Sequence, residues 1–98
     1  MRGVDPYVAA LMPWLEIDHL HISPDVWAKL LDKHGIDAAA LRAMLLERRR
    51  FPFRWRTDHR GTRAILETEL DGRVITVILY PWARRPPDWW HLATAYRI

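Results

Sequence analysis

The chain has 98 residues, half of them apolar and six of them tryptophan, so it is one domain that can bury a core without metal or disulfide support. It contains no cysteine, which excludes a disulfide framework, a thiolate nucleophile and cysteine-ligated zinc, and which fits a cytoplasmic protein. The net charge of +3 favours a polyanionic partner.

No apolar run, including residues 74–82, is long enough to cross a bilayer, so we expect no contact with a membrane. Residues 1–14 carry an early acid and two prolines and do not read as a secretory signal. We expect residues 1–13 to be an appendage and residues 14–98 to be a single domain.

The first predicted strand begins at residue 14, because polar and apolar side chains alternate there. One side of this strand is expected to carry Leu15, Ile17, His19 and His21. Ser23 followed by Pro24 then predicts the start of a helix that ends at Gly35. Its spacing predicts a core-facing stripe of Trp27, Leu30, Leu31 and His34.

Asp37 is expected to cap a second helix over residues 38–48, with Leu41, Met44 and Leu45 facing inward. After this helix the apolar period changes to two, which predicts a second strand from Phe51 to Arg56. A turn at residues 58–61 leads to a third strand over residues 62–70.

The best predicted hairpin turn is Asp71-Gly72, because a tight type I′ turn needs positive φ at both central residues. It precedes a β-branched strand over residues 73–80, typical of a central strand buried on both faces. A loop at residues 81–88 and a last strand at 89–97 follow. The expected fold is α+β in the order β-α-α-β-β-β-β, with both N-terminal helices on one face of a twisted antiparallel sheet and the other face left for a ligand.

Residues 48–63 contain seven arginines and one acid, with three aromatic residues between them. Arginine pairs with phosphate and aromatic rings stack on unpaired bases, so this stretch predicts RNA binding. The alternative is an amphipathic strand whose aromatic residues face the core, with arginine favoured by genomic base composition. The predicted RNA-binding residues are Arg54, Trp55, Arg56, Arg60, Arg73, Arg84 and Arg85.

Several short motifs, taken in order, resemble the BrnT-like branch of the RelE toxins and, more widely, the barnase–EndoU–colicin–RelE superfamily of ribonucleases. They are ISP at 22–24, KHGI at 33–36, RGTR at 60–63, DGR at 71–73 and LATAY at 92–96, within a resemblance that runs from Ile17 to the C-terminus. The resemblance implies cleavage of RNA (messenger or transfer RNA, including RNA on the ribosome) without a metal ion or other cofactor, by attack of the 2′-OH on the adjacent phosphate. It also implies an antitoxin or immunity protein as partner, and we allow for a homodimer.

The same resemblance implies roles for His34, Thr94 and Tyr96 in catalysis. His34 has a structural alternative as a buried histidine at a helix end. His59 in the predicted turn and Arg63 at the start of the third predicted strand are further catalytic candidates, since imidazole can move a proton and guanidinium can stabilise a phosphorane. If the other face of the last strand binds RNA, His91 and Arg97 become the better pair.

His19 and His21 can hold a metal ion from one strand face, but no third ligand is evident and edge-strand histidines are the simpler interpretation, so no metal site is predicted. Two other functions remain open. One is a non-catalytic module that binds RNA or protein. The other is an interaction subunit whose partner surface includes Trp82, Trp89 and Trp90.

Overall fold

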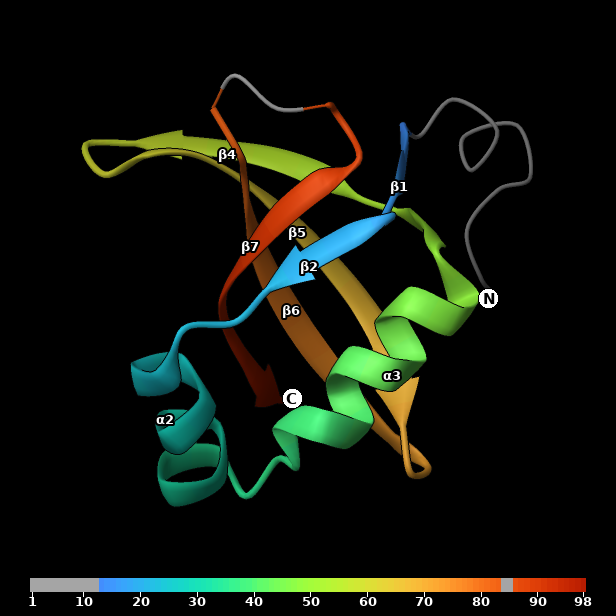
Figure 1. Ribbon diagram of the computed structural model, residues 1–98, viewed down its shortest axis with the longest axis vertical. Helices are drawn as coiled ribbons and strands as arrows, with labels where there is room; N and C mark the ends of the chain where they lie inside the picture. The colour runs from blue at the N-terminus through green and yellow to red at the C-terminus, as the bar shows by residue number, and fades with distance from the viewer. Residues whose placement is uncertain (1–12, 84–85) are drawn as a thin grey trace.

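A computed structural model describes residues 13–83 and 86–98, and within them the chain is α+β with two helices and a mostly antiparallel sheet (Figure 1). The predicted appendage, except Pro13, and the predicted RNA-binding residues Arg84 and Arg85 lie outside the described residues. The elements are β1 (Trp14–Glu16), β2 (His19–His21), α2 (Pro24–His34), α3 (Ala38–Arg48), β3 (Arg50–Pro52), β4 (Arg54–Asp58), β5 (Gly61–Leu70), β6 (Arg73–Pro81) and β7 (Trp89–Arg97). Neither described helix is long and apolar enough to cross a membrane.

The main sheet has five strands in the order β2-β7-β6-β5-β4, and a separate two-stranded sheet joins β1 to β3. Its pairs are antiparallel except β2 with β7, which run parallel. The second described strand, β2, and the last one, β7, therefore lie side by side in the main sheet, with β2 at its edge (Figure 1).

The predicted first strand is divided in two, because its halves bond to different partners. Ile17 N donates to the carbonyl oxygen of Arg49 at 2.6 Å, whereas Asp18 N donates to that of Asp88 at 2.8 Å. The break shifts the alternation, so Leu15 and Ile17 face the core while His19 and His21 are exposed and Leu20 is buried. The prediction that these histidines share a side with Leu15 and Ile17 was wrong.

The predicted second strand is also divided, into β3 and β4, at Phe53. The N–H of Phe53 donates to the carbonyl oxygen of Pro13 at 3.1 Å instead of joining a ladder. Phe51 and Phe53 are buried and Trp55 is half-exposed. The core interpretation therefore holds for the two phenylalanines but not for Trp55.

The helix ends were predicted correctly. The Ser23 hydroxyl accepts from Val26 N, and the Asp37 carboxylate accepts from Ala39 N and Ala40 N. Gly35 ends α2 with φ of 62°, in the left-handed region. At the β5–β6 hairpin, Asp71 and Gly72 have φ of 53° and 77°, as a type I′ turn requires.

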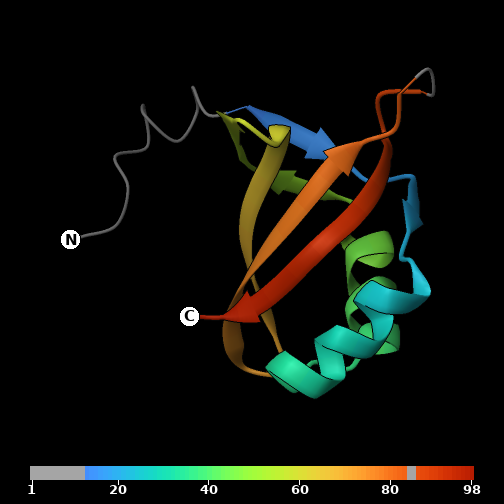
Figure 2. The same cartoon turned by 90° about the vertical axis from the view of Figure 1, so that its left-hand side faces the viewer.

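The predicted apolar stripe of α2 is only partly buried. Leu30 is 1% exposed, but Trp27 is 43% and Leu31 is 64% exposed. The reason is the position of α2, which packs against β7 beside the sheet edge and has little contact with α3 (Figure 2). In α3 the prediction was correct, since Leu41 and Leu45 are fully buried and Met44 packs against the core.

Strand β7 contains a β-bulge that the simple alternation missed. Ile78 pairs with Thr94, and the next residue, Leu79, pairs with Leu92, so Ala93 is the extra residue. Before the bulge Trp90 and Leu92 are buried, and after it Ala95 is buried. The even-numbered residues therefore do not share one face, and the predicted pairing of His91 with Arg97 on one face was wrong.

Helices α2 and α3 lie on the same side of the main sheet (Figure 2). Buried residues from both helices join Leu66, Val77 and Leu92 in one core cluster on that side. We call the opposite side the open face, because no other described helix or strand covers it. By the strand register it carries Arg54, Arg56, Asp58, Arg63, Ile65, Glu67, Glu69, Val74, Thr76, Ile78, Tyr80, His91, Thr94 and Tyr96.

We predict that Gly35→Ala lowers the free energy of unfolding by about 1–2 kcal/mol, because a Cβ atom is strained at positive φ. The matched control is Gly35→Asn, since asparagine tolerates this conformation while its Cβ meets the same Arg97 guanidinium, 3.1 Å from the Ala Cβ position. Urea unfolding should rank the wild type first, Asn second and Ala last. Equal losses for the two variants would mean that contact with Arg97, not backbone strain, sets the cost.

Candidate functional site

His34 and Tyr96, two of the predicted catalytic residues, lie near each other. Their ring centroids are 6.3 Å apart where the end of α2 meets the end of β7. The guanidinium of Arg97 donates to the carbonyl oxygens of His34 and Gly35, at 3.3 and 3.0 Å, and so caps the end of α2. Thr94 shares the open face with Tyr96. His34 and Tyr96 are thus brought together, and Thr94 lies two residues before Tyr96 on the same face of β7.

His59 and Arg63, the other two catalytic candidates, lie at the far edge of the sheet in and beside the β4–β5 turn. Arg63 forms an ion pair with Asp58, and its side chain is only 14% exposed. The Asp58 carboxylate also accepts from Arg60 N at 2.8 Å, which fixes the turn. The structure therefore divides the predicted catalytic set into two groups that it does not bring together.

The predicted RNA-binding residues also divide between the faces. Arg54 and Arg56 pair with Ile65 and Arg63 and lie on the open face, and Arg60 is exposed in the turn. Trp55 faces the helix side, where its ring lies 6.1 Å from that of Trp90.

Arg73 pairs with Leu70 and helps to line a small cavity of about 140 Å³ between the end of α2 and the β5–β6 hairpin. It therefore lies apart from the open-face arginines. Arg63, predicted as a catalytic residue, instead joins Arg54 and Arg56 on the open face.

A cluster of five rings, which we call the histidine–tryptophan cluster, gathers where β2 meets β7. It consists of His19, His21, Trp82, Trp89 and His91. His19 stacks on Trp89 with ring centroids 4.2 Å apart, and His91 stacks on Trp82 at 4.5 Å. Edge contacts with ring centroids 5.2–5.9 Å apart complete the packing. Sequence reasoning named these residues separately but missed the cluster, because the parallel pairing joins segments 70 residues apart.

The centre of this cluster is a pair of imidazoles. The Nδ1 atoms of His21 and His91 are 3.2 Å apart, so one ring donates to the other. Partial burial lowers the pKa of His91 below its usual 6.5, and the nearby charge of His21 lowers it further. At neutral pH His91 is therefore an uncharged imidazole that can accept a proton.

Across the open face, the register aligns five polar side chains from five strands. Arg56 pairs with Arg63, Tyr80 pairs with His91, and His91 pairs with His21. Continuing the β5–β6 register by one residue beyond Ala64 and Leu79 places Arg63 beside Tyr80. Neighbouring strands are about 4.8 Å apart, so the backbones of Arg63 and His91 are separated by about 10 Å. We call Arg56, Arg63, Tyr80, His91 and His21 the polar row.

No group of three histidine, aspartate or glutamate side chains in residues 13–83 and 86–98 is arranged to hold a metal ion. The alternative of a metal held by His19 and His21 therefore finds no third ligand among them. The chemistry that the polar row offers is proton transfer by imidazole and charge stabilisation by guanidinium.

No protein-family model, curated protein sequence or solved structure matches this chain.

We predict that the free energy of unfolding falls as the pH drops from 7 to below 6.5. The unfolded chain takes up a proton at an ordinary histidine pKa of 6.5, whereas folded His91 takes it up only at lower pH, so acid favours the unfolded state in that window. Urea titrations between pH 7 and pH 5 should show a smaller slope for His91→Gln than for wild type. Equal slopes for the two proteins would contradict a lowered pKa.

Proposed function

We propose that this protein binds RNA on its open face and cleaves it without a metal ion, as an endoribonuclease toxin of the RelE- and BrnT-like kind. The observation that carries this proposal is the polar row, in which arginines on one side and a histidine pair on the other flank Tyr80. A phosphate between them can be held by guanidinium while an imidazole acts on the adjacent ribose.

The charges on the open face favour one position for the RNA. Arg54, Arg56 and Arg63 lie toward one end of the sheet, and exposed Arg60 lies in the adjoining turn. Asp58 at this end offsets only one of these charges, through its ion pair with Arg63. Toward the other end, Glu67 pairs with Thr76, which in turn pairs with Tyr96. A polyanion therefore prefers the end that holds the histidine pair.

This distribution moves the proposed catalytic centre away from His34 and Tyr96. Their end of β7 faces Glu67 across the sheet, and a carboxylate repels a phosphate there. The His34 carbonyl oxygen is also bound by Arg97, which indicates a structural role for this helix end. We therefore assign proton transfer to His21 and His91.

In the proposed reaction, neutral His91 accepts the proton of the ribose 2′-OH. The 2′-oxygen forms a bond to the adjacent phosphorus, and the bond from phosphorus to the 5′-oxygen breaks. His91 passes its Nδ1 proton to Nδ1 of His21 across their hydrogen bond, and Nε2 of His21 donates its proton to the departing 5′-oxygen, while Arg63 stabilises the charge of the phosphorane. The products are a 2′,3′-cyclic phosphate and a free 5′-hydroxyl.

The proposal includes the setting that the resemblance implies, namely the bacterial cytoplasm and an antitoxin or immunity protein as partner. A non-catalytic RNA-binding module is the second candidate function. It is favoured by the Arg63–Asp58 ion pair, because a guanidinium already bound to a carboxylate is less free to stabilise a phosphorane.

We predict that purified protein cleaves total bacterial RNA in EDTA and leaves cyclic-phosphate ends. His91→Ala and His21→Ala should each lower the rate by about 10²-fold or more, as loss of a general acid or base does. His34→Ala is the matched control and should keep most of the activity. Cleavage that depends on His34 but not on His91 would overturn our assignment.

We predict that Arg63→Gln and Arg56→Gln weaken binding of a 2′-O-methyl oligonucleotide, which cannot be cleaved. Each should lower the slope of log affinity against log salt by about 1, as expected for a lost phosphate contact. Arg73→Gln is the control, because Arg73 lies beside the end of α2, away from the open-face arginines. Salt-dependent binding by a protein that does not cleave RNA would favour the second candidate. Equal effects at Arg63 and Arg73 would contradict binding on the open face.

A further inference from the structure

A tryptophan-lined cleft on the helix side of the sheet takes no part in the proposed RNA site. Its volume is about 610 Å³, and it lies between β1 and the ends of β4, β6 and β7. Trp14 and Trp55 line it and are 54% and 50% exposed, whereas Trp90 is almost fully buried. Glu16 and Asp88 belong to the same lining. The half-exposed ring of Trp55 beside Asp88 therefore makes this cleft a candidate binding site.

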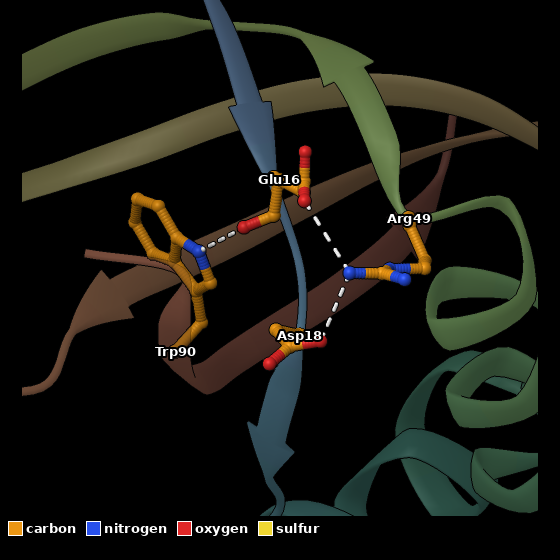
Figure 3. A network of polar contacts seen from close by, with 4 residues as sticks. All are labelled: Glu16, Asp18, Arg49 and Trp90. Carbon is orange, nitrogen blue, oxygen red and sulfur yellow. Dashed lines mark hydrogen bonds and ion pairs between the residues drawn. The ribbon is translucent and has the colours of Figure 1, made fainter. Parts of the chain in front are cut away.

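The walls of this cleft are fixed by contacts within the chain. The indole N–H of Trp90 donates to the carbonyl oxygen of Glu16 at 2.9 Å, which attaches β7 to β1 (Figure 3). Phe53 packs edge-on against Trp55 with ring centroids 4.9 Å apart. The carbonyl oxygen of Asp88 accepts from Asp18 N, which holds the turn before β7 against the start of β2. The cleft is thus a preformed feature of the fold.

This region already binds two arginines of the chain itself. Arg49 reaches between the carboxylates of Glu16 and Asp18, at 3.3 and 2.9 Å (Figure 3). Arg50 lies over the ring of Trp14, with the guanidinium carbon 5.8 Å from its centroid. The Asp88 carboxylate, in contrast, has no ion-pair partner among the described residues. Within the described residues, the cleft therefore combines an acid that has no ion-pair partner, Asp88, with the half-exposed indole of Trp55.

We propose that this cleft binds an arginine side chain from a basic segment of a partner protein. The flat guanidinium would stack on the indole of Trp55 and form charge-assisted hydrogen bonds with the Asp88 carboxylate. RNA is disfavoured here because the Asp88 carboxylate repels phosphate, whereas Glu16 is already paired with Arg49. Arginine is favoured over lysine because its planar group both stacks on a ring and pairs with a carboxylate in two-point contact. The proposal does not depend on the RNA-cleaving function.

The first test follows the indole N–H signals of ¹⁵N-labelled protein during titration with an end-blocked Gly-Gly-Arg-Gly-Gly peptide. Each of the six tryptophans gives one signal, assigned by single Trp→Phe variants. We expect saturable shifts for Trp14, Trp55 and Trp90 and none for Trp27, which lies on the exposed side of α2. The matched peptide carries citrulline, which keeps the shape of arginine but has no charge, and it should bind about tenfold more weakly.

The second test compares Asp88→Asn with Asp25→Asn. The Asp88 variant keeps the backbone carbonyl that supports the cleft, so it should fold normally and bind the arginine peptide about tenfold more weakly. Asp25 lies in the first turn of α2, away from the cleft, and its variant should bind like wild type. Equal affinity for citrulline and arginine, or no effect of Asp88→Asn, would overturn the proposal. So would displacement of the peptide by an uncharged nucleoside, which would assign the cleft to a base.

Discussion

The parallel pairing of β2 with β7 is the constraint on which the proposed site depends. Three residues near the start of the described chain lie against the last strand, and the carbonyl oxygen of Asp88 holds them there through Asp18 N and His19 N. This pairing places His21 against His91 and stacks His19 on Trp89. Because the contact joins segments about 70 residues apart, it forms only when the whole domain folds.

The bulge at Ala93 is the second constraint, because it reverses which side chains of β7 point to the open face. On one side of the bulge β7 presents His91 to the open face, and on the other side it turns Thr94 and Tyr96 to that same face. Arg97 is thereby directed to the end of α2, where it binds two carbonyl oxygens. The bulge thus separates a stabilising arginine from the residues available to a ligand.

The helix caps and the tight turn were predictable from the sequence, but the hydrogen-bond register between distant strands was not. The caps at Ser23 and Asp37, the end at Gly35 and the turn at Asp71-Gly72 each follow from the residue's own conformational preferences. The divided strands and the bulge depend on which partner offers a hydrogen bond, as when Ile17 bonds to Arg49. The histidine–tryptophan cluster was missed for the same reason, and His34 was given a catalytic role through resemblance alone. Trp55 and Arg73 were predicted to bind RNA, but their strand partners show that they do not lie on the open face. Trp55 pairs with Ala64 and Arg73 pairs with Leu70, and both pairs lie on the helix side of the sheet.

The most direct test of the central claim is to map where an uncleavable RNA lies. Backbone amide shifts should be recorded for labelled protein with and without a 2′-O-methyl oligonucleotide. We expect the largest shifts at Arg63, Tyr80 and His91, with the α2 residues around Trp27 unchanged. Shifts centred on His34 and Tyr96, or on α2, would contradict the open-face site at the histidine pair.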